Sequence, residues 1–280
     1  MLAEAKKLSS VDVKKAWLPL VSVIVPTYNS ASTLDQCLRS VKGQYYKNVE
    51  VIVVDRYSID GTKDIAENYG ATFLQRGPER SCQKNYGAKH ARGELLYFVD
   101  SDFVLEPDVV GRCVEGCKFF DAVCTVNYSV GRGIWGKSIA LNERFLARDP
   151  TIQVARFLKR RVFFEIGGFD EGLVVGEDLD LYARLLDRGY KVGSVDAVEW
   201  HIGEPQTLRE IAKRNFYYGK TVRSYFRKRG TLAVRQLSPF KPHLICNLVK
   251  TGSPYLFSLA IVDLVRWISS VFGLICCFLG

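Results

Sequence analysis

The first predicted strand lacks the glycine-rich motifs that identify several large classes of enzyme. No G-x-G-x-x-G follows it, so the dinucleotide fingerprint is missing there, and the chain's match to G-x-x-x-x-G-K-S/T is GRGIWGKS at residues 131–138, far from this strand. A G-x-S-x-G elbow is also missing, and His90, His201 and His243 form no recognisable pairing with a nucleophile. These absences disfavour a dehydrogenase, and they leave covalent catalysis without an obvious agent. The short match at residues 131–138 is by itself weak evidence for a phosphate loop.

The cysteines also lack the spacing of a metal site. The chain has eight of them, with no C-x-x-C pair and no histidine partners at zinc-ligand spacing. A structural zinc site is therefore disfavoured, and we interpret most of these cysteines as small, buried apolar residues. Disulfide bonds stay an open alternative, because some hyperthermophile intracellular proteins use them.

The composition is that of a folded, basic protein. At 280 residues, with 48% hydrophobic and 12% aromatic residues, the chain is long enough for one large or two small domains. The formal net charge is +9, and the basic excess is concentrated between residues 213 and 241. Such a run suits phosphate groups, anionic lipid or nucleic acid, and a merely solvated charged face is the alternative. The N-terminus contains no hydrophobic signal core, so we expect the catalytic part to stay in the cytoplasm.

From residue 21 onward, short apolar runs alternate with segments of helical periodicity. The runs VSVIVP and VEVIVVD enclose a segment that places Leu34, Cys37, Leu38 and Val41 on one helical face. The pattern continues with predicted helices near 60–69, near 81–91 and from Pro107, and with predicted strands at 71–76, 94–100 and 121–126. Continuous apolar strands joined through helices predict an α/β fold, in which helices cover both faces of a mainly parallel central sheet.

Polar residues stand where several of the predicted strands end. Pro26, Tyr28 and Asn29 follow the first strand, Asp55 ends the second, and Asp100-Ser101-Asp102 ends the fourth. Because ligands bind beyond the carboxyl ends of the strands in open α/β sheets, we expect these residues to converge on one cleft.

Asp100 and Asp102 are unusual neighbours for a buried strand. Paired like charges repel and resist desolvation unless something neutralises them, and a cation would do so. Taken alone, a D-x-D is equally compatible with a turn or a helix cap. Mg²⁺ or Mn²⁺, held by one or two carboxylates and completed by substrate phosphates, fits so sparse a ligand set and would neutralise a diphosphate leaving group.

The stretch GGFDEGLVVGEDLDLYARLLDRGY, residues 167–190, combines a glycine-rich turn with an acidic pair at the start of a helix. Residues two apart on a helix point about 200° away from each other, so Asp178 and Asp180 cannot share an ion. Glu177 and Asp178 are compatible with plain N-terminal helix acids, and in the functional interpretation Asp178 is a base.

The last 37 residues are the most apolar part of the chain. After a helix start at Ser253-Pro254, the segment 255–280 is interrupted by Asp263 and Arg266, and its longest uncharged stretch is 14 residues. That is short of the ~18 expected for a spanning helix, so we interpret it as an amphipathic helix lying in the membrane interface. A core helix packed on the domain and a re-entrant or truncated spanning segment are the alternatives.

Taken together, five stretches in this order resemble the family 2 glycosyltransferases of GT-A fold, in the version found in archaeal-type members. They are VSVIVPTYNSASTLDQCLRSV, VEVIVVDRYSIDGT, GELLYFVDSD, GGFDE and GEDLDLYARLLDRGYKV, and the resemblance covers about residues 21–225. One departure is that the family usually reads acid-acid-Gly-Ser where this chain has Asp55, Arg56 and Tyr57, which leaves the nucleobase preference open.

The resemblance implies a nucleotide-sugar donor, a divalent cation (Mn²⁺ or Mg²⁺) and inversion at the anomeric carbon. Carried over by motif, Asp178 is the catalytic base, and Asp102 holds the metal, with His201 where related enzymes often place a diphosphate- or metal-contacting residue. The implied nucleotide-sugar-binding residues are Pro26, Tyr28, Asn29, Asp55, Arg80, Gln83, Asp100, Ser101 and Glu177.

The function that these features imply is hexose transfer, with mannose from GDP-mannose as the best guess, to a lipid-linked polyprenyl acceptor. A UDP-hexose donor and transfer to bare polyprenyl phosphate are alternatives, as are a catalytically silent GT-A-like module that docks on membrane and a nucleotidyltransferase. No nucleic-acid partner is expected. We expect the protein at the cytoplasmic face of the cell membrane, peripheral or monotopic through its C-terminal helices.

This interpretation divides the chain into four expected parts, each with its own character. The divisions are an N-terminal segment 1–20, a GT-A catalytic domain 21–205, a basic helical extension 206–243 and membrane-associating helices 244–280.

Overall fold

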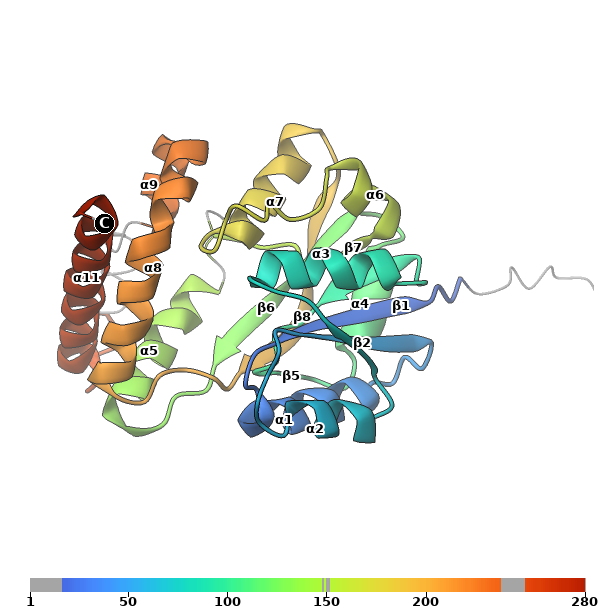
Figure 1. Cartoon of the computed structure of the whole chain (residues 1–280), viewed down its shortest axis with the longest axis horizontal. Coiled ribbons are helices and arrows are strands. Elements are labelled where there is room, and N and C mark those ends of the chain that lie inside the picture. Colours follow the sequence, from blue (N-terminus) through green and yellow to red (C-terminus); the bar gives the residue numbers. More distant parts are fainter. Residues whose placement is uncertain (1–16, 148, 150–151, 238–249, 280) are drawn as a thin grey trace, which may run out of the picture.

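A computed structural model gives the fold of the chain (Figure 1). The residues that it leaves undescribed are 1–16, 148, 150–151, 238–249 and 280. Most of the expected N-terminal segment 1–20, the end of the basic run with Lys241, and the expected boundary between residues 243 and 244 therefore lie outside the described residues.

The fold is built on an eight-stranded sheet with the order β3-β2-β1-β4-β7-β6-β8-β5. The neighbours β3, β2, β1 and β4 are parallel, as are β6 and β8. Only β7, against β4 and β6, and β5, against β8, form antiparallel pairs, so the prediction of a mainly parallel sheet is confirmed. The strands are β1 (Val21–Thr27), β2 (Val49–Asp55), β3 (Thr72–Gln75), β4 (Leu95–Phe98), β5 (Phe103–Leu105), β6 (Ala122–Ser129), β7 (Phe157–Lys159) and β8 (Val192–His201).

Helices cover both faces of the sheet, as predicted (Figure 1). Val23 and Val25 of β1 pack with α1 and α4, whereas Ile24 between them packs with α3, α6 and α7, because successive strand residues point to opposite faces. All four apolar residues of the predicted stripe on α1 are buried. The helices are α1 (Ala31–Lys42), α2 (Thr62–Asn68), α3 (Arg80–His90), α4 (Val109–Gly116), α5 (Gly133–Leu146), α6 (Arg160–Glu165), α7 (Glu177–Asp187), α8 (Leu208–Arg229), α9 (Thr231–Leu237) and α11 (Leu256–Leu279).

The two acids of the D-x-D lie in a turn between distant strands. The strand predicted over 94–100 is β4, which ends at Phe98 in the middle of the sheet, and the chain then runs to β5 at the sheet edge. The backbone N–H of Phe103 donates to the carbonyl of Asp100 across 3.0 Å, which closes the turn. Both carboxylates are thereby held at the carboxyl end of β4.

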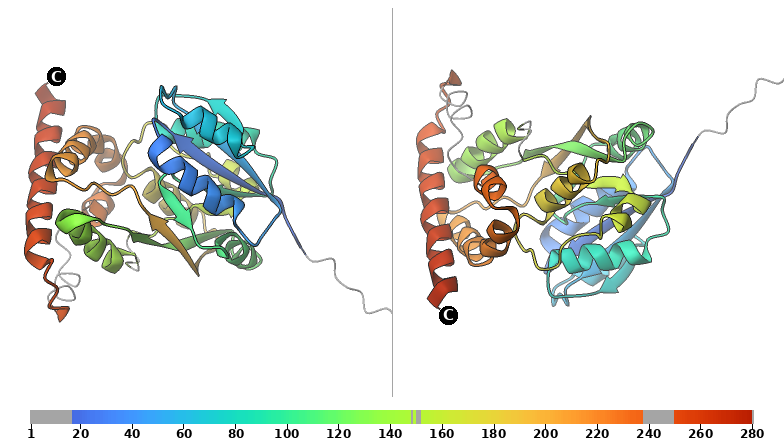
Figure 2. Two further views of the ribbon diagram at one scale, coloured as in Figure 1. Left: turned by 90° about the horizontal axis from the view of Figure 1, so that it is seen from below. Right: turned by 90° about the horizontal axis from the view of Figure 1, so that it is seen from above.

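The two longest helices, α8 and α11, lie side by side at one end of the molecule, with α5 between α11 and the sheet (Figure 2). Glycines allow their backbones to approach closely. A methyl group added at Gly219 of α8 would overlap the carbonyl oxygen of Ser270, and one added at Gly273 of α11 would overlap that of Phe216. The predicted apolar C-terminal helix therefore exists, and it is packed on the rest of the fold along α8.

Gly219→Ala is expected to destabilise the protein, because the new methyl group meets rigid backbone of α11. Overpacking of this kind costs about 1–3 kcal/mol. Gly111→Ala in α4 is the matched control, since a methyl group there has nothing within 4 Å. Alanine is favoured over glycine in a helix by about 1 kcal/mol, so this variant should gain stability. Urea denaturation measures the change in unfolding free energy for both variants. An unchanged midpoint for Gly219→Ala would contradict the close α8–α11 packing.

Candidate active site

A cleft of about 670 Å³ opens where β1, β4 and β8 end, and the N-terminus of α3 and one face of α8 complete its wall. Asn29, Asp55, Glu177 and Asp178 do not line this cleft. The predicted site residues that do line it are Pro26, Tyr28, Arg80, Gln83, Asp100, Ser101, Asp102 and His201.

Asp100 is the more enclosed acid of the D-x-D turn. Its carboxylate lies 3.7 Å from Lys84 Nζ and 3.8 Å from Arg156 Nη1, and both cations are buried. Burial alone would raise the pKa of Asp100, but Lys84, Arg80 and Arg156 outweigh it and hold the pKa well below its ordinary value. The protein's own cations therefore keep this carboxylate ionised at the end of a buried strand.

Asp102 is paired with the histidine predicted to share its site. His201 Nε2 lies 3.0 Å from Asp102 Oδ2, and His201 Nδ1 lies 2.8 Å from Glu204 Oε1. Burial lowers the pKa of His201, but hydrogen bonds to the two carboxylates outweigh it and raise the pKa to about 10. Burial would raise the pKa of Glu204, whereas His201 and Arg214, at 3.1 Å, lower it to about 2. The imidazole is thus held as a cation between two carboxylates at the edge of the cleft.

Lys84 connects the D-x-D turn to α7, although it was not among the predicted site residues. Its side chain is fully buried, and Nζ lies 3.1 Å from Asp178 Oδ1 and 3.7 Å from both Asp100 Oδ1 and Glu177 Oε1. Burial lowers the pKa of Lys84, but the three carboxylates outweigh it and raise the pKa above its ordinary value. Because one ammonium contacts both Asp100 and Asp178, the fold brings the two predicted acidic motifs to a single place.

The start of α7 depends on a glycine. Gly176 has φ of +78°, and a side chain there would overlap the ring of Tyr225. Glu177 follows it, buried, with its carboxylate 3.3 Å from Arg80 Nη2; burial raises the pKa of Glu177, and Arg80 offsets only part of this. Asp180 is on another side of the helix, where Arg229 Nε donates to it across 2.8 Å. Asp178 and Asp180 therefore have separate partners, as helical geometry predicts.

Asn29 and Asp55 fix loops at the rim of the cleft. Asp55 is buried, and its Oδ2 accepts from the backbone N–H of Ser58 at 2.7 Å. Asn29 has φ of +47°, and its Oδ1 accepts from the backbone N–H of Ile59 at 3.0 Å. These bonds hold the loop after β2 against the loop after β1, so that Tyr28 stays exposed on the cleft wall.

Sequence reasoning missed several further residues of the cleft, including a group from α8. Arg214, Tyr217 and Tyr218 of α8 line it, and Arg56 lies over the ring of Tyr28 with its guanidinium carbon 4.8 Å from the ring centre. In the sequence, only the adjacent Tyr217 and Tyr218 within the basic run could have indicated that this segment lines a binding site. Nothing in the local pattern shows that this helix returns to the ends of β1 and β4.

Comparison with known proteins agrees with this geometry. The sequence model of the family described as "Glycosyl transferase family 2" matches residues 22–170, more than half of the chain. The glycosyltransferase AglE of Haloferax volcanii is 29% identical over 223 residues, which cover 72% of this chain and 73% of AglE. The succinoglycan biosynthesis protein ExoO of Rhizobium meliloti is 30% identical over 221 residues, which cover 69% of this chain and 62% of ExoO.

A solved structure shows the same fold. It is the mannosyltransferase PcManGT from Pyrobaculum calidifontis, in complex with GDP-Man and Mn²⁺. Its TM-score is 0.61 at 18% identity, with 93% of this chain and 88% of that chain covered. The resemblance inferred from the ordered motifs is confirmed: the chain belongs to glycosyltransferase family 2 and is a transferase of GT-A fold.

Proposed function

We propose that the protein is an inverting, metal-dependent glycosyltransferase that moves a hexose from a nucleotide sugar to a lipid-linked acceptor at the membrane surface. The observation that carries the proposal is the contact of Lys84 with both Asp100 and Asp178, which joins the cleft to a candidate base. A catalytically silent docking module would not require the buried cluster of Asp100, Glu177 and Asp178 around Lys84, and we therefore favour an enzyme.

GDP-mannose is the donor we propose, with a UDP-hexose as the alternative. PcManGT, whose structure matches 93% of this chain, binds GDP-Man, and this supports the choice. The similarity does not identify which residues of this chain would contact the nucleobase. In this chain Tyr28 and Arg56 offer a flat, exposed surface on which a nucleobase can stack. Gln83 Nε2 donates to the carbonyls of Thr27 and Val54, which leaves its Oε1 for a donor hydroxyl.

The residues of the cleft fit a divalent cation that the donor completes. Asp102 offers a carboxylate, which suits Mn²⁺ and Mg²⁺, and His201 would add an imidazole that suits Mn²⁺ once the metal displaces a ring proton. A side chain at Gly203 would overlap the carboxylate of Asp102, so glycine leaves room for this ligand. Among the described residues no group of three or more His, Cys, Asp or Glu could hold a metal, and diphosphate oxygens would supply the remaining ligands. The bound cation would neutralise the diphosphate leaving group.

Asp178 is the base that we propose for the acceptor. Lys84 holds its Oδ1, and the side chain is 21% exposed, so Oδ2 is left to accept the proton of an acceptor hydroxyl. As that oxygen forms its bond to the anomeric carbon, the bond to the diphosphate breaks on the opposite face of the sugar. Inversion follows from this arrangement. Lys84 acts as a positioning residue, because its buried ammonium fixes the carboxylate from behind.

Attachment to the membrane is proposed through α11. Its residues Leu256–Cys277 are long and apolar enough to cross a membrane by length and composition, and most of them are not buried within the protein. The buried side of α11 faces α8 and α5, and the opposite side exposes a row of large apolar residues. This row consists of Phe257, Leu264, Trp267, Ile268, Phe272 and Ile275.

The packing of α11 favours a position in the interface over a span. It lies along α8, which carries the exposed cations Lys213, Lys220 and Arg227 at seven-residue spacing on one face. A spanning α11 would bring these charges into the lipid core, at a cost of about 2.5–3.5 kcal/mol each. In the interface, the same cations attract anionic headgroups. Arg229 and other cations of the basic run pair with carboxylates of α7 instead.

This attachment supports a lipid-linked acceptor and a location at the cytoplasmic face of the cell membrane. A helix whose apolar row is immersed in the interface keeps the enzyme beside substrates that diffuse in the bilayer. A glycan on a polyprenyl carrier and bare polyprenyl phosphate both meet this condition.

Asp102→Ala and Asp178→Ala should each abolish transfer, for different reasons. Loss of Asp102 removes the carboxylate for the cation, so the thermal shift produced by GDP-mannose with Mn²⁺ should shrink. Loss of Asp178 should spare that shift and lower donor turnover by about 10²–10⁴-fold. Asp187→Ala, on the exposed side of the same helix, is the control. Turnover retained in either of the two site variants would refute the assigned roles.

Lys84→Met should lose both activity and stability. Methionine matches the length of lysine but leaves three carboxylates without their shared cation, and breaking a buried ion pair costs about 3–5 kcal/mol. Chemical denaturation and donor turnover measure the two losses. Lys63→Met, on the exposed face of α2, is the matched control. A fully active, equally stable Lys84→Met protein would contradict the positioning role.

Phe272→Asp should weaken binding to vesicles of phosphatidylcholine and phosphatidylglycerol by about tenfold or more, because burying a phenylalanine contributes about 1.5–3 kcal/mol. Phe119→Asp is the control, since Phe119 is similarly exposed but follows α4. Vesicle co-sedimentation provides the measurement. Equal losses in both variants, or none in Phe272→Asp, would contradict docking through α11.

A further inference from the structure

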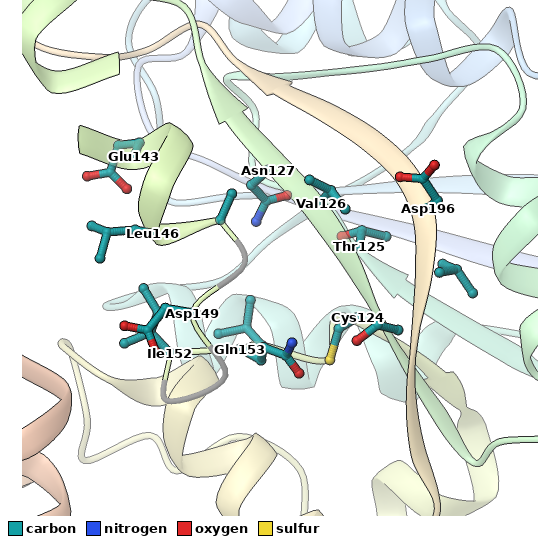
Figure 3. Close-up of a pocket in the computed structure, with 14 residues that line it drawn as sticks. Cys124, Thr125, Val126, Asn127, Glu143, Leu146, Asp149, Ile152, Gln153 and Asp196 are labelled. Atoms are coloured by element: carbon teal, nitrogen blue, oxygen red, sulfur yellow. The ribbon is translucent and has the colours of Figure 1, made fainter. Parts of the chain in front are cut away.

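A second cavity, of about 540 Å³, lies beside the candidate active site and shares no lining residue with the donor cleft. Its walls come from β6 and β8, from the C-terminal end of α5 and from the residues that precede β7 (Figure 3). The function proposed above assigns no role to this cavity.

One set of contacts connects the cavity to the D-x-D turn. Thr125, which lines the cavity, donates from Oγ1 to Glu199 Oε1 across 2.7 Å. Glu199 Oε2 accepts from Arg156 Nη2 at 2.6 Å, and Arg156 Nη1 lies 3.8 Å from Asp100 Oδ2. The cavity and the cleft are therefore neighbours, separated by the buried pair of Arg156 and Glu199.

A second contact connects the cavity to the candidate base. Gln153, another lining residue, accepts at Oε1 a long hydrogen bond of 3.5 Å from the hydroxyl of Tyr182. Tyr182 stands four residues after Asp178 on α7, so the two side chains share a helix face about one turn, or ~5.4 Å, apart. Through the contact of Gln153 with Tyr182, the cavity therefore adjoins the helix that carries Asp178.

The chemistry of the cavity suits an uncharged, hydroxyl-rich ligand. Asn127 and Gln153 lie on opposite sides of it, and Asn127 Oδ1 is buried with no hydrogen-bond partner in the described part of the chain (Figure 3). The amide groups both donate and accept, as sugar hydroxyls do. Glu143, Asp149 and Asp196 add carboxylates, and none of the described lining residues is lysine or arginine. A phosphate group would meet like charge here without a counterion.

We propose that this cavity binds a sugar residue of the acceptor, so that the acceptor is a glycan and not bare polyprenyl phosphate. The inference rests on the proposed glycosyltransferase function and adds the chemical class of its second substrate. Two cations next to the cavity are already engaged, which supports the proposal: Arg156 is paired with Glu199, and Arg266 lies 3.8 Å from Glu143.

The test uses the full chain with GDP-mannose and Mn²⁺, and as acceptors it uses a panel of n-octyl glycosides (glucoside, mannoside, galactoside and N-acetylglucosaminide) and farnesyl phosphate. We expect product with at least one glycoside and none with farnesyl phosphate. Asn127→Leu and, separately, Gln153→Leu should raise the KM for that glycoside by about tenfold, the effect of losing about 1.4 kcal/mol of hydrogen bonding, with a smaller change in kcat. Asn68→Leu, at an exposed amide on α2, is the control and should change neither constant.

Each other result overturns the proposal. Transfer to farnesyl phosphate alone, donor hydrolysis without transfer to any member of the panel, or a glycoside KM that neither cavity variant changes would exclude a sugar subsite here. Melting temperatures of the variants distinguish misfolding from lost binding. If Asn127→Leu fails to fold, Gln153→Leu still tests the proposal, because Gln153 lies outside the sheet. Wild-type protein that neither binds nor hydrolyses a GDP- or UDP-sugar would instead refute the proposed function itself.

Discussion

The ammonium of Lys84 is the point on which the geometry of the site depends. A lysine with no solvent exposure is strongly unfavourable unless carboxylates surround it, and here three do so from two different elements. The lysine comes from α3, Asp100 from the turn after β4, and the other two acids from the start of α7. The buried ammonium gains its carboxylate partners only when these three elements are assembled, so the fold and the candidate catalytic arrangement form together.

Charge is distributed unequally on the two sides of this cluster. On the donor side, Arg80, Lys84 and Arg156 face the acids of the cleft, which suits a region that must receive a diphosphate. Beyond the Arg156–Glu199 pair, the cavity wall turns to amides and carboxylates. The cleft and the cavity therefore offer different electrostatic surroundings on the two sides of this pair.

Helix α8 joins the site to the proposed membrane surface. Arg214, Tyr217 and Tyr218 line the cleft, whereas Phe216 and Gly219 contact α11 on the other side of the helix. With 3.6 residues per turn, these two sets fall on opposite faces. The same helix is therefore a wall of the donor cleft and the support for the apolar helix, which couples the position of the cleft to the orientation of α11.

The sequence by itself determined the α/β class, the mainly parallel sheet, the elements of the first half and the family, because apolar periodicity and ordered motifs are local properties. It also picked out Asp100, Asp102 and Asp178, since acids at strand and helix ends stand out against an apolar background, and it picked out His201 through the family resemblance. It did not reveal Lys84, because one lysine in a charged helix carries no local sign that it is buried. Only the tertiary structure decided which acids share a cation, that α8 returns to the cleft, and that a cavity adjoins α7. The physical reason is that these features depend on residues distant in the chain, such as Lys84 and Asp178, 94 positions apart, and Arg156 and Glu199, 43 positions apart. The free energy of such contacts exists only once the intervening chain has folded.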